Sequence, residues 1–93
     1  MKLKEAKAKF PDAIREVENI KEGEIYTKIY SDIEDKITFK VLFKAYRCVM
    51  GEFSMIFVYM NEFGRCTYMF AADCGVESMG QDNYNNSNYL IKA

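Results

Sequence analysis

The stretch KITFKVLFKAY, residues 36–46, decides the fold class. Read with a period of two, its odd positions form an unbroken apolar row, and lysines recur among its even positions. On a helix the aromatic residues would scatter around the cylinder, and most residues of the stretch are mediocre helix formers. The stretch therefore predicts a β-strand with Lys36, Lys40 and Lys44 on its outer face. The inward apolar row consists of Ile37, Phe39, Val41, Phe43 and Ala45.

Further strands are predicted on both sides of this one. Residues 24–30 alternate with the same period and are rich in strand-forming residues. Residues 53–62 are apolar on both faces until Asn61, which is typical of a central strand covered on two sides. The tight turn Glu62-Phe63-Gly64 leads into an alternating run over 65–73, so these two strands form a hairpin. Residues 88–92 are predicted to add a short edge strand.

The N-terminal segment has helical periodicity. Its apolar residues recur every three or four positions, which predicts helical structure over residues 2–21. Pro11 interrupts this pattern, because proline is tolerated at the start of a helix but not in its interior. We expect either one helix kinked at Pro11, or a short segment ending near Phe10 and a firmer helix from Pro11 to Lys21.

These elements predict a single α+β domain spanning residues 1–93. An N-terminal helix, kinked or split at Pro11, packs on an antiparallel meander sheet of four to five strands. Residues 74–88 are rich in Asn and have no period, so they are expected to form an irregular loop. Loops of this length in compact domains commonly bind something or are disordered.

The composition argues against several classes of protein. With 13 basic and 14 acidic side chains the chain is close to neutral, whereas proteins that bind duplex DNA are usually clearly basic. The longest apolar stretch, at 54–60, is too short to cross a bilayer, and the N-terminus lacks the apolar region of a signal peptide. Three cysteines form neither a disulfide framework nor a zinc pattern. We therefore expect a cytoplasmic protein with no membrane partner.

The chain contains no histidine, which removes the commonest catalytic base and the nucleophile systems that depend on it. Glycine-rich phosphate-binding motifs are missing too. The acidic residues Asp32, Glu34 and Asp35 lack the pattern of a calcium loop. We expect no enzymatic activity, no catalytic residue, no metal site and no cofactor.

The most favoured function is a protein-binding module, because Tyr, Phe and Met are enriched at interfaces and the chain has 20 of them. Such a module would act as an adaptor or an inhibitor of a host protein, or would bind a second copy of itself. By analogy of size and composition alone, it fits phage and mobile-element accessory proteins, including anti-CRISPR-type inhibitors. The candidate contacts are Tyr26, Tyr30, Leu42 and Tyr46 on the outer sheet face, with Met79, Tyr84 and Tyr89 in or beside the loop.

Two alternatives remain open. Lys36, Lys40 and Lys44, with Tyr46 on the same strand face, could bind phosphates and stack bases in a single-stranded nucleic acid. The loop at 74–88 could instead bind a small ligand or a nucleotide.

Overall fold

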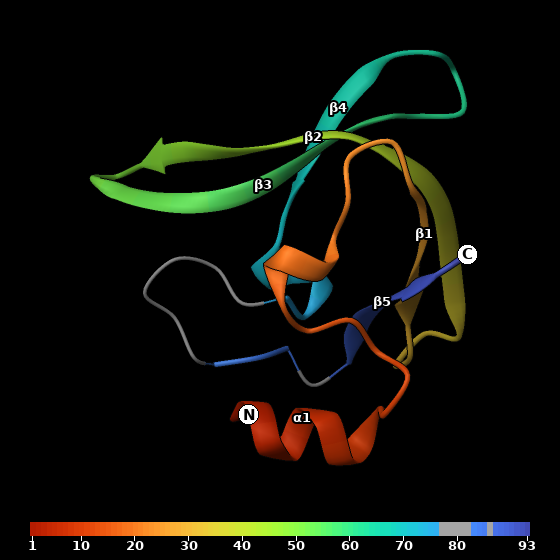
Figure 1. Cartoon of the computed structure of the whole chain (residues 1–93), viewed down its shortest axis with the longest axis vertical. Helices are drawn as coiled ribbons and strands as arrows, with labels where there is room; N and C mark the ends of the chain where they lie inside the picture. Colours follow the sequence, from red (N-terminus) through yellow and green to blue (C-terminus); the bar gives the residue numbers. More distant parts are fainter. Residues whose placement is uncertain (77–82, 86) are drawn as a thin grey trace.

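The computed structural model contains a five-stranded antiparallel sheet and one N-terminal α-helix, which confirms the predicted α+β class (Figure 1). It describes residues 1–76, 83–85 and 87–93. In chain order the elements are α1 (Leu3–Lys9), the 3₁₀ turn η1 (Val17–Asn19), β1 (Ile25–Tyr30), β2 (Asp35–Val49), β3 (Glu52–Met60), β4 (Cys66–Phe70), the 3₁₀ turn η2 (Ala72–Cys74) and β5 (Asn88–Lys92).

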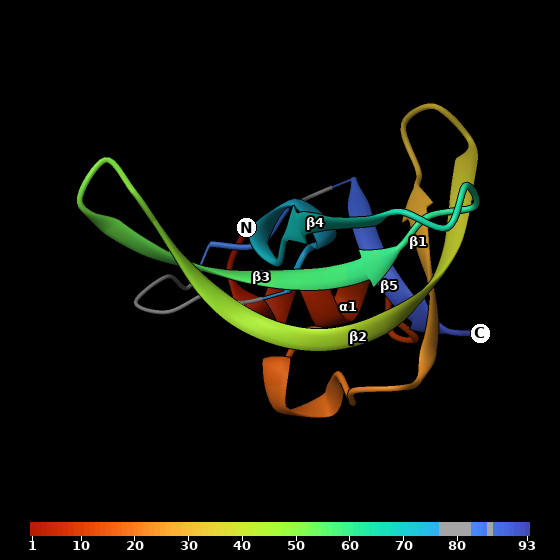
Figure 2. The ribbon, with the colours of Figure 1, turned by 90° about the horizontal axis from the view of Figure 1, so that it is seen from above.

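The strands lie in the order β4-β3-β2-β1-β5, and every described neighbouring pair is antiparallel. The first four strands form the expected meander, and β5 returns to pair with β1 at the opposite edge from β4. At 15 residues β2 is longer than predicted, and it bends strongly along its length (Figure 2). Its second half pairs with β3 in a hairpin that reaches away from the other strands (Figures 1 and 2).

Local turn chemistry explains the β2–β3 and β3–β4 hairpins. Between β2 and β3, Met50 and Gly51 have φ angles of 52° and 82°. Two successive residues with positive φ suit the tight turn whose twist matches that of the flanking strands. Between β3 and β4, the Asn61 side-chain oxygen accepts hydrogen bonds from the backbone N–H groups of Phe63 and Arg65, at 2.9 and 3.0 Å. The turn signal around Gly64 is thereby confirmed.

A β-bulge at Leu42 divides β2 into two halves with opposite side-chain facing. Val41 lies opposite Tyr59 on β3, but Phe43 lies opposite Val58, so Leu42 is the extra residue. Because side chains alternate along a strand, one extra residue exchanges the faces beyond it. The predicted unbroken alternation is therefore wrong after Val41, and Phe43, expected in the core, is 48% exposed.

The core lies on one face of the sheet, which we call the core face. Its centre is formed by Phe39, Val41 and Phe57, all at most 4% exposed. The covering layer comes from the segment around η1 and from the turn η2, rather than from α1. The buried core cluster comprises Ile20, Tyr26, Phe39, Val41, Met55, Phe57, Ala71, Cys74, Val76 and Leu90.

The predicted helix from Pro11 to Lys21 is wrong. The α-helix ends at Lys9, two residues before Pro11. Between Pro11 and Lys21 only the 3₁₀ turn η1 is helical. In this segment the Ile14 N–H donates to the Leu90 carbonyl oxygen at 2.7 Å, so edge pairing with β5 replaces a helical hydrogen bond. Tertiary contacts of this kind commonly override local helix propensity.

The same segment wraps around the edge of β5. Phe10 stacks on Tyr89 with ring centroids 4.4 Å apart, Ile14 pairs with Leu90, and Ile20 is fully buried in the core. Because Tyr89 and Leu90 point to opposite faces, the chain passes from the outer face of β5 to its core face. This wrapping covers one edge of the sheet and leaves β4 as the other edge.

Candidate functional site

The outer face of the sheet carries a continuous apolar patch over β2, β3 and β4. The strand register places Phe43, Val58 and Tyr68 in one row across the three strands. Ala45, Ile56 and Phe70 form the next row. The outer patch is defined as Phe43, Ala45, Ile56, Val58, Met60, Tyr68 and Phe70. Its exposed members are Phe43, Met60 and Tyr68, at 48%, 47% and 40%.

The end of the β2–β3 hairpin carries a second group of exposed apolar side chains, which we call the arm tip (Tyr46, Val49, Met50 and Phe53). Their exposed fractions range from 39% for Val49 to 98% for Met50. With Phe43, they make up five of the ten exposed large hydrophobic residues in the described part of the chain. A two-stranded ribbon is marginally stable by itself, so an exposed apolar tip favours contact with another surface.

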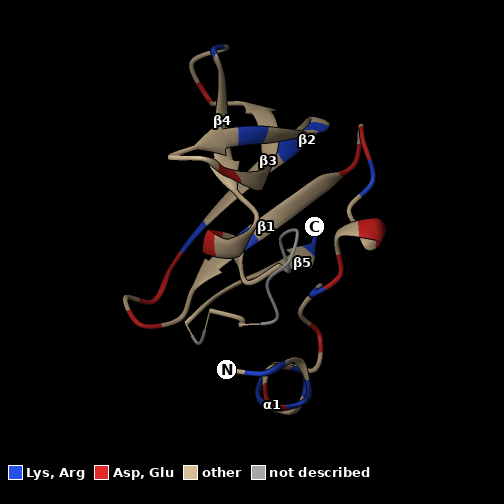
Figure 3. Cartoon of the chain, turned by 90° about the vertical axis from the view of Figure 1, so that its left-hand side faces the viewer, with Lys and Arg blue, Asp and Glu red and all other residues tan. Residues whose placement is uncertain are grey.

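The outer patch has a cation, Arg47, at its border. The Arg47 guanidinium carbon lies 4.7 Å from the centre of the Tyr68 ring, a distance at which a cation is attracted by the ring face. Figure 3 shows basic residues on β2 but a neutral ribbon along β4. The patch is therefore an apolar surface bordered by a cation, and not a basic surface.

Two of the predicted contact residues are buried. Tyr26 is 1% exposed, and its hydroxyl accepts a hydrogen bond from the Lys21 N–H at 2.7 Å. Tyr84 is 5% exposed, and its backbone N–H donates to the Met1 carbonyl oxygen. The prediction that these two tyrosines are exposed contacts is wrong, because the Tyr26 row of β1 faces the core.

The other predicted contacts are dispersed over the molecule. Tyr46 is 54% exposed and belongs to the arm tip. Leu42 is half-buried at the bulge, and Tyr30 is half-buried beneath the Lys28 ammonium group, which lies 4.6 Å from its ring centre. Tyr89 is half-buried against Phe10. Met79 lies outside the described residues, as do the rest of residues 77–82 and residue 86 of the predicted loop at 74–88.

The three lysines do not share a face, contrary to the prediction. Lys36 and Lys40 precede the bulge and are exposed on the outer face. Lys44 follows the bulge, pairs with the buried Phe57, and donates from Nζ to the Val17 carbonyl oxygen at 3.3 Å. The basic stripe with Tyr46 on which the nucleic-acid alternative depended is therefore not formed.

Sequence reasoning missed a buried arginine. Arg15 is 2% exposed and donates from Nη1 to the Gly75 carbonyl oxygen at 3.0 Å. Its Nε and Nη2 atoms are buried and have no hydrogen-bond partner among the described residues, and burial lowers its pKa below the usual value. The rings of Phe10 and Tyr89 each lie 5.8 Å from its guanidinium carbon. No periodicity distinguished this arginine from the solvent-facing charges beside it in the sequence.

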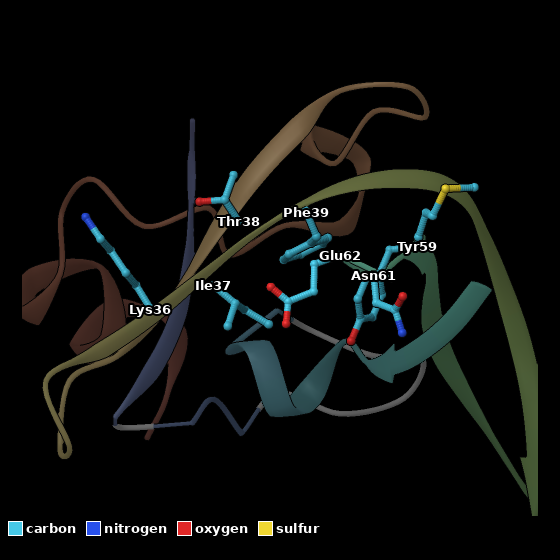
Figure 4. Close-up of a pocket in the computed structure, with 8 residues that line it drawn as sticks. Lys36, Ile37, Thr38, Phe39, Tyr59, Asn61 and Glu62 are labelled. Carbon is cyan, nitrogen blue, oxygen red and sulfur yellow. The ribbon is translucent and has the colours of Figure 1, made fainter. Parts of the chain in front are cut away.

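A cleft of about 410 Å³ opens where β2 and β3 diverge beyond their last paired residues. Figure 4 shows Ile37, Phe39, Tyr59 and Glu62 gathered around it, while Lys36 and Thr38 point away. The rings of Phe39 and Tyr59 have centroids 5.0 Å apart. Burial raises the pKa of Tyr59, so this phenol stays protonated at neutral pH and is a hydrogen-bond donor rather than a base.

The described residues contain no cluster of acidic or thiol side chains that could hold a metal ion. Cys74 is buried near Met69, and burial raises the pKa of its thiol to about 12, which makes it a poor nucleophile. Within the described chain, no helix is long and apolar enough to span a membrane. The chain matches no family model, no curated protein and no solved structure. The outer patch and arm tip are therefore the candidate site on their geometry alone.

Proposed function

We propose that this chain is a non-enzymatic protein-binding module that contacts its partner through the outer patch and the arm tip. The observation that carries the proposal is the concentration of exposed apolar side chains along residues 43–53. Phe43 and Val49 lie on the outer face of this hairpin, and Tyr46 and Phe53 lie on its other face, so apolar side chains are exposed on both faces. Large exposed apolar surface on a monomer commonly marks a site that binds another macromolecule.

The chemistry of the surface favours a protein over a nucleic acid. Aromatic residues, Met and Arg are the types enriched at protein interfaces. Phe43 and Arg47 lie on the outer face of the hairpin, Met50 lies in its turn, and Phe53 lies on the opposite face. Binding to nucleic acid gains most of its affinity from several cations arranged along a backbone. The bulge separates Lys44 from the other two lysines and so removes such an arrangement.

A photo-crosslinking experiment tests the proposal with matched probes. The photoreactive phenylalanine analogue benzoylphenylalanine replaces Phe43, Phe53 or Phe63 in cells to which the chain is native. Phe63 is 80% exposed in the turn between β3 and β4 and does not belong to the outer patch or the arm tip. The three probes therefore differ in position but not in chemistry.

Irradiation is expected to give an adduct of one defined mass at positions 43 and 53, and no such adduct at position 63. An adduct larger than two copies of the chain identifies a different protein as the partner. Equal crosslinking from all three positions, or none from 43 and 53, would contradict the proposal.

A further inference from the structure

The two edge strands of the sheet, β5 and β4, differ in how the described chain covers them. At β5 the free edge is covered by the Ile14–Leu90 bridge, and the strand ends with the charged residue Lys92. At β4 the sequence Cys-Thr-Tyr-Met-Phe contains no charge and no proline, as the neutral ribbon in Figure 3 shows. Natural proteins normally protect edge strands with such features, so an edge that has none of them among the described residues indicates pairing with another strand.

The backbone groups on the free side of β4 can be assigned from its hydrogen bonds to β3. The Ala71 N–H donates to the Met55 carbonyl oxygen, and the Asn61 N–H donates to the Arg65 carbonyl oxygen. Antiparallel pairing alternates with a period of two, so the odd residues of β4 face β3. The even residues Cys66, Tyr68 and Phe70 therefore direct their N–H and C=O groups away from the sheet.

This set of free groups is symmetric about Tyr68. We propose that two copies of the chain pair their β4 strands in antiparallel fashion across a two-fold axis at Tyr68, and so form one continuous ten-stranded sheet. The axis places Tyr68 opposite its own copy and Cys66 opposite Phe70 of the second copy. All three pairs are of the type that exchanges two main-chain hydrogen bonds, giving about six in total.

Charge complementarity favours a second copy over an unrelated strand. Arg65 immediately precedes β4, and Asp73 lies just beyond its other end in η2. Both are exposed, and neither forms an ion pair with another described residue. Antiparallel pairing about Tyr68 brings Arg65 of each copy to the Asp73 end of the other, so the interface has two symmetry-related ion pairs and no charge within the paired strands.

The dimer also extends the outer patch, because Tyr68 and Phe70 lie on β4 beside the new strand junction. Joining the two sheets makes a single apolar face from two patches. The inference does not depend on the proposed function, since the pairing uses main-chain groups of β4. Tyr68 and Phe70 belong both to β4 and to the outer patch, whereas substitutions at Tyr46 or Phe53 change the arm tip alone.

The mass in solution is the first test. Light scattering after size exclusion at about 50 µM is expected to give twice the chain mass of 10.9 kDa. The variant Tyr68→Lys, which sets two like charges opposite each other, is expected to give the mass of one chain while its circular dichroism stays native. Tyr46→Lys, on the arm tip, is the matched control and is expected to remain dimeric. A wild-type chain that is monomeric at this concentration overturns the proposal.

Disulfide trapping tests the register. In a Cys48→Ser, Cys66→Ser background, Tyr68→Cys places two thiols across the axis with their Cα atoms about 5.5 Å apart, which lies within the range that a disulfide spans. Mild oxidation is expected to yield a covalent dimer from Tyr68→Cys but not from the matched control Tyr46→Cys in the same background. Equal trapping of the two variants, or trapping of Tyr46→Cys alone, would refute pairing at Tyr68.

Charge exchange separates this interface from other dimers. Arg65→Asp and Asp73→Arg are each expected to raise the dissociation constant of the dimer by about three- to tenfold, because each replaces two attractive contacts with two repulsive ones. The double variant Arg65→Asp, Asp73→Arg is expected to return to within about twofold of the wild-type value. Additive weakening in the double variant would show that the two charges do not meet across the axis.

Discussion

Alanine substitution at Phe39 and at Phe43 should have very different effects, although both belong to the apolar row of β2 predicted from the sequence. Phe39 is 4% exposed in the core, and truncation of a buried Phe leaves a cavity and costs about 3–5 kcal/mol. Phe43 is 48% exposed on the outer face. Its truncation loses about half of a transfer free energy of about 1.5–3 kcal/mol and leaves no closed cavity, so we expect a loss of about 1 kcal/mol.

Urea unfolding followed by far-ultraviolet circular dichroism measures both values, and an unchanged slope against urea shows that the two variants unfold as the wild type does. The control is Ile33→Ala, because Ile33 is 65% exposed in a turn and its truncation should leave the midpoint nearly unchanged. If Leu42 forms a bulge, the free energy of unfolding should fall by at least about 2 kcal/mol more in Phe39→Ala than in Phe43→Ala. Equal losses of about 3 kcal/mol or more at both positions would mean that β2 alternates regularly and that the bulge does not exist.

Three further predictions concern the turn η2 and its surroundings. Gly75→Ala would place a methyl group against the Arg15 guanidinium and the Asn88 carbonyl at a φ of 70°, whereas Gly64→Ala at 77° meets only open space. In thermal or urea unfolding we expect Gly64→Ala to lose about 1 kcal/mol and Gly75→Ala at least about 2 kcal/mol more; equal losses would refute the contact. Native chain at pH 8 should react with a thiol reagent at the two exposed cysteines but not at Cys74, whose thiol reacts only after unfolding; rapid reaction of three thiols would contradict its burial. Burial raises the pKa of Cys74 from 9.0 to about 12, so its contribution to stability is complete below pH 9 and is lost as the pH rises towards 12. Between pH 9 and pH 12 the free energy of unfolding of Cys74→Ala should accordingly fall less than that of the wild type. The same pH dependence in both proteins would refute a raised pKa at Cys74.

Much of the sheet could be predicted because its signals are local. The period-two alternation located β1 and the first half of β2, and Gly64 marked the hairpin between β3 and β4. Residues 88–92 are predicted to be a short edge strand, and β5 lies at an edge of the sheet. These signals depend on side chains a few positions apart, so the sequence alone contains them.

The errors arose where distant contacts decide the structure. A bulge has no dipeptide signature, although the apolar run Val41-Leu42-Phe43 breaks the alternation and is the one trace of it in the sequence. The face of β1 that is buried depends on what covers it, so Tyr26 was placed outside although it lies in the core. The stripe that ends at Ile20 fitted a helix, but Ile14 instead pairs with an edge strand about 75 positions away.

Because of these errors, the contact residues predicted from the sequence differ from those of the outer patch and the arm tip. Tyr46 is the one predicted contact that belongs to the arm tip. The period-two alternation instead predicts Phe43 to be in the core, and it predicts no contact role for Phe53 or Tyr68. Side-chain facing beyond the bulge determines which residues a partner can meet. Because Leu42 is an extra residue, regular alternation counted from Lys36 predicts the wrong face for every residue of β2 after Leu42.

Cross-strand nuclear Overhauser effects in the β2–β3 hairpin test the bulge, and with it the position of the proposed binding surface, most directly. The bulged register pairs Lys44 with Phe57 and Phe43 with Val58, so contacts are expected within each of these pairs, and the Phe57 ring should lie near the Lys44 side chain. A regular strand continuing from Val41 opposite Tyr59 would instead pair Phe43 with Phe57. Strong contacts between those two aromatic rings, with none between Lys44 and Phe57, would contradict the account.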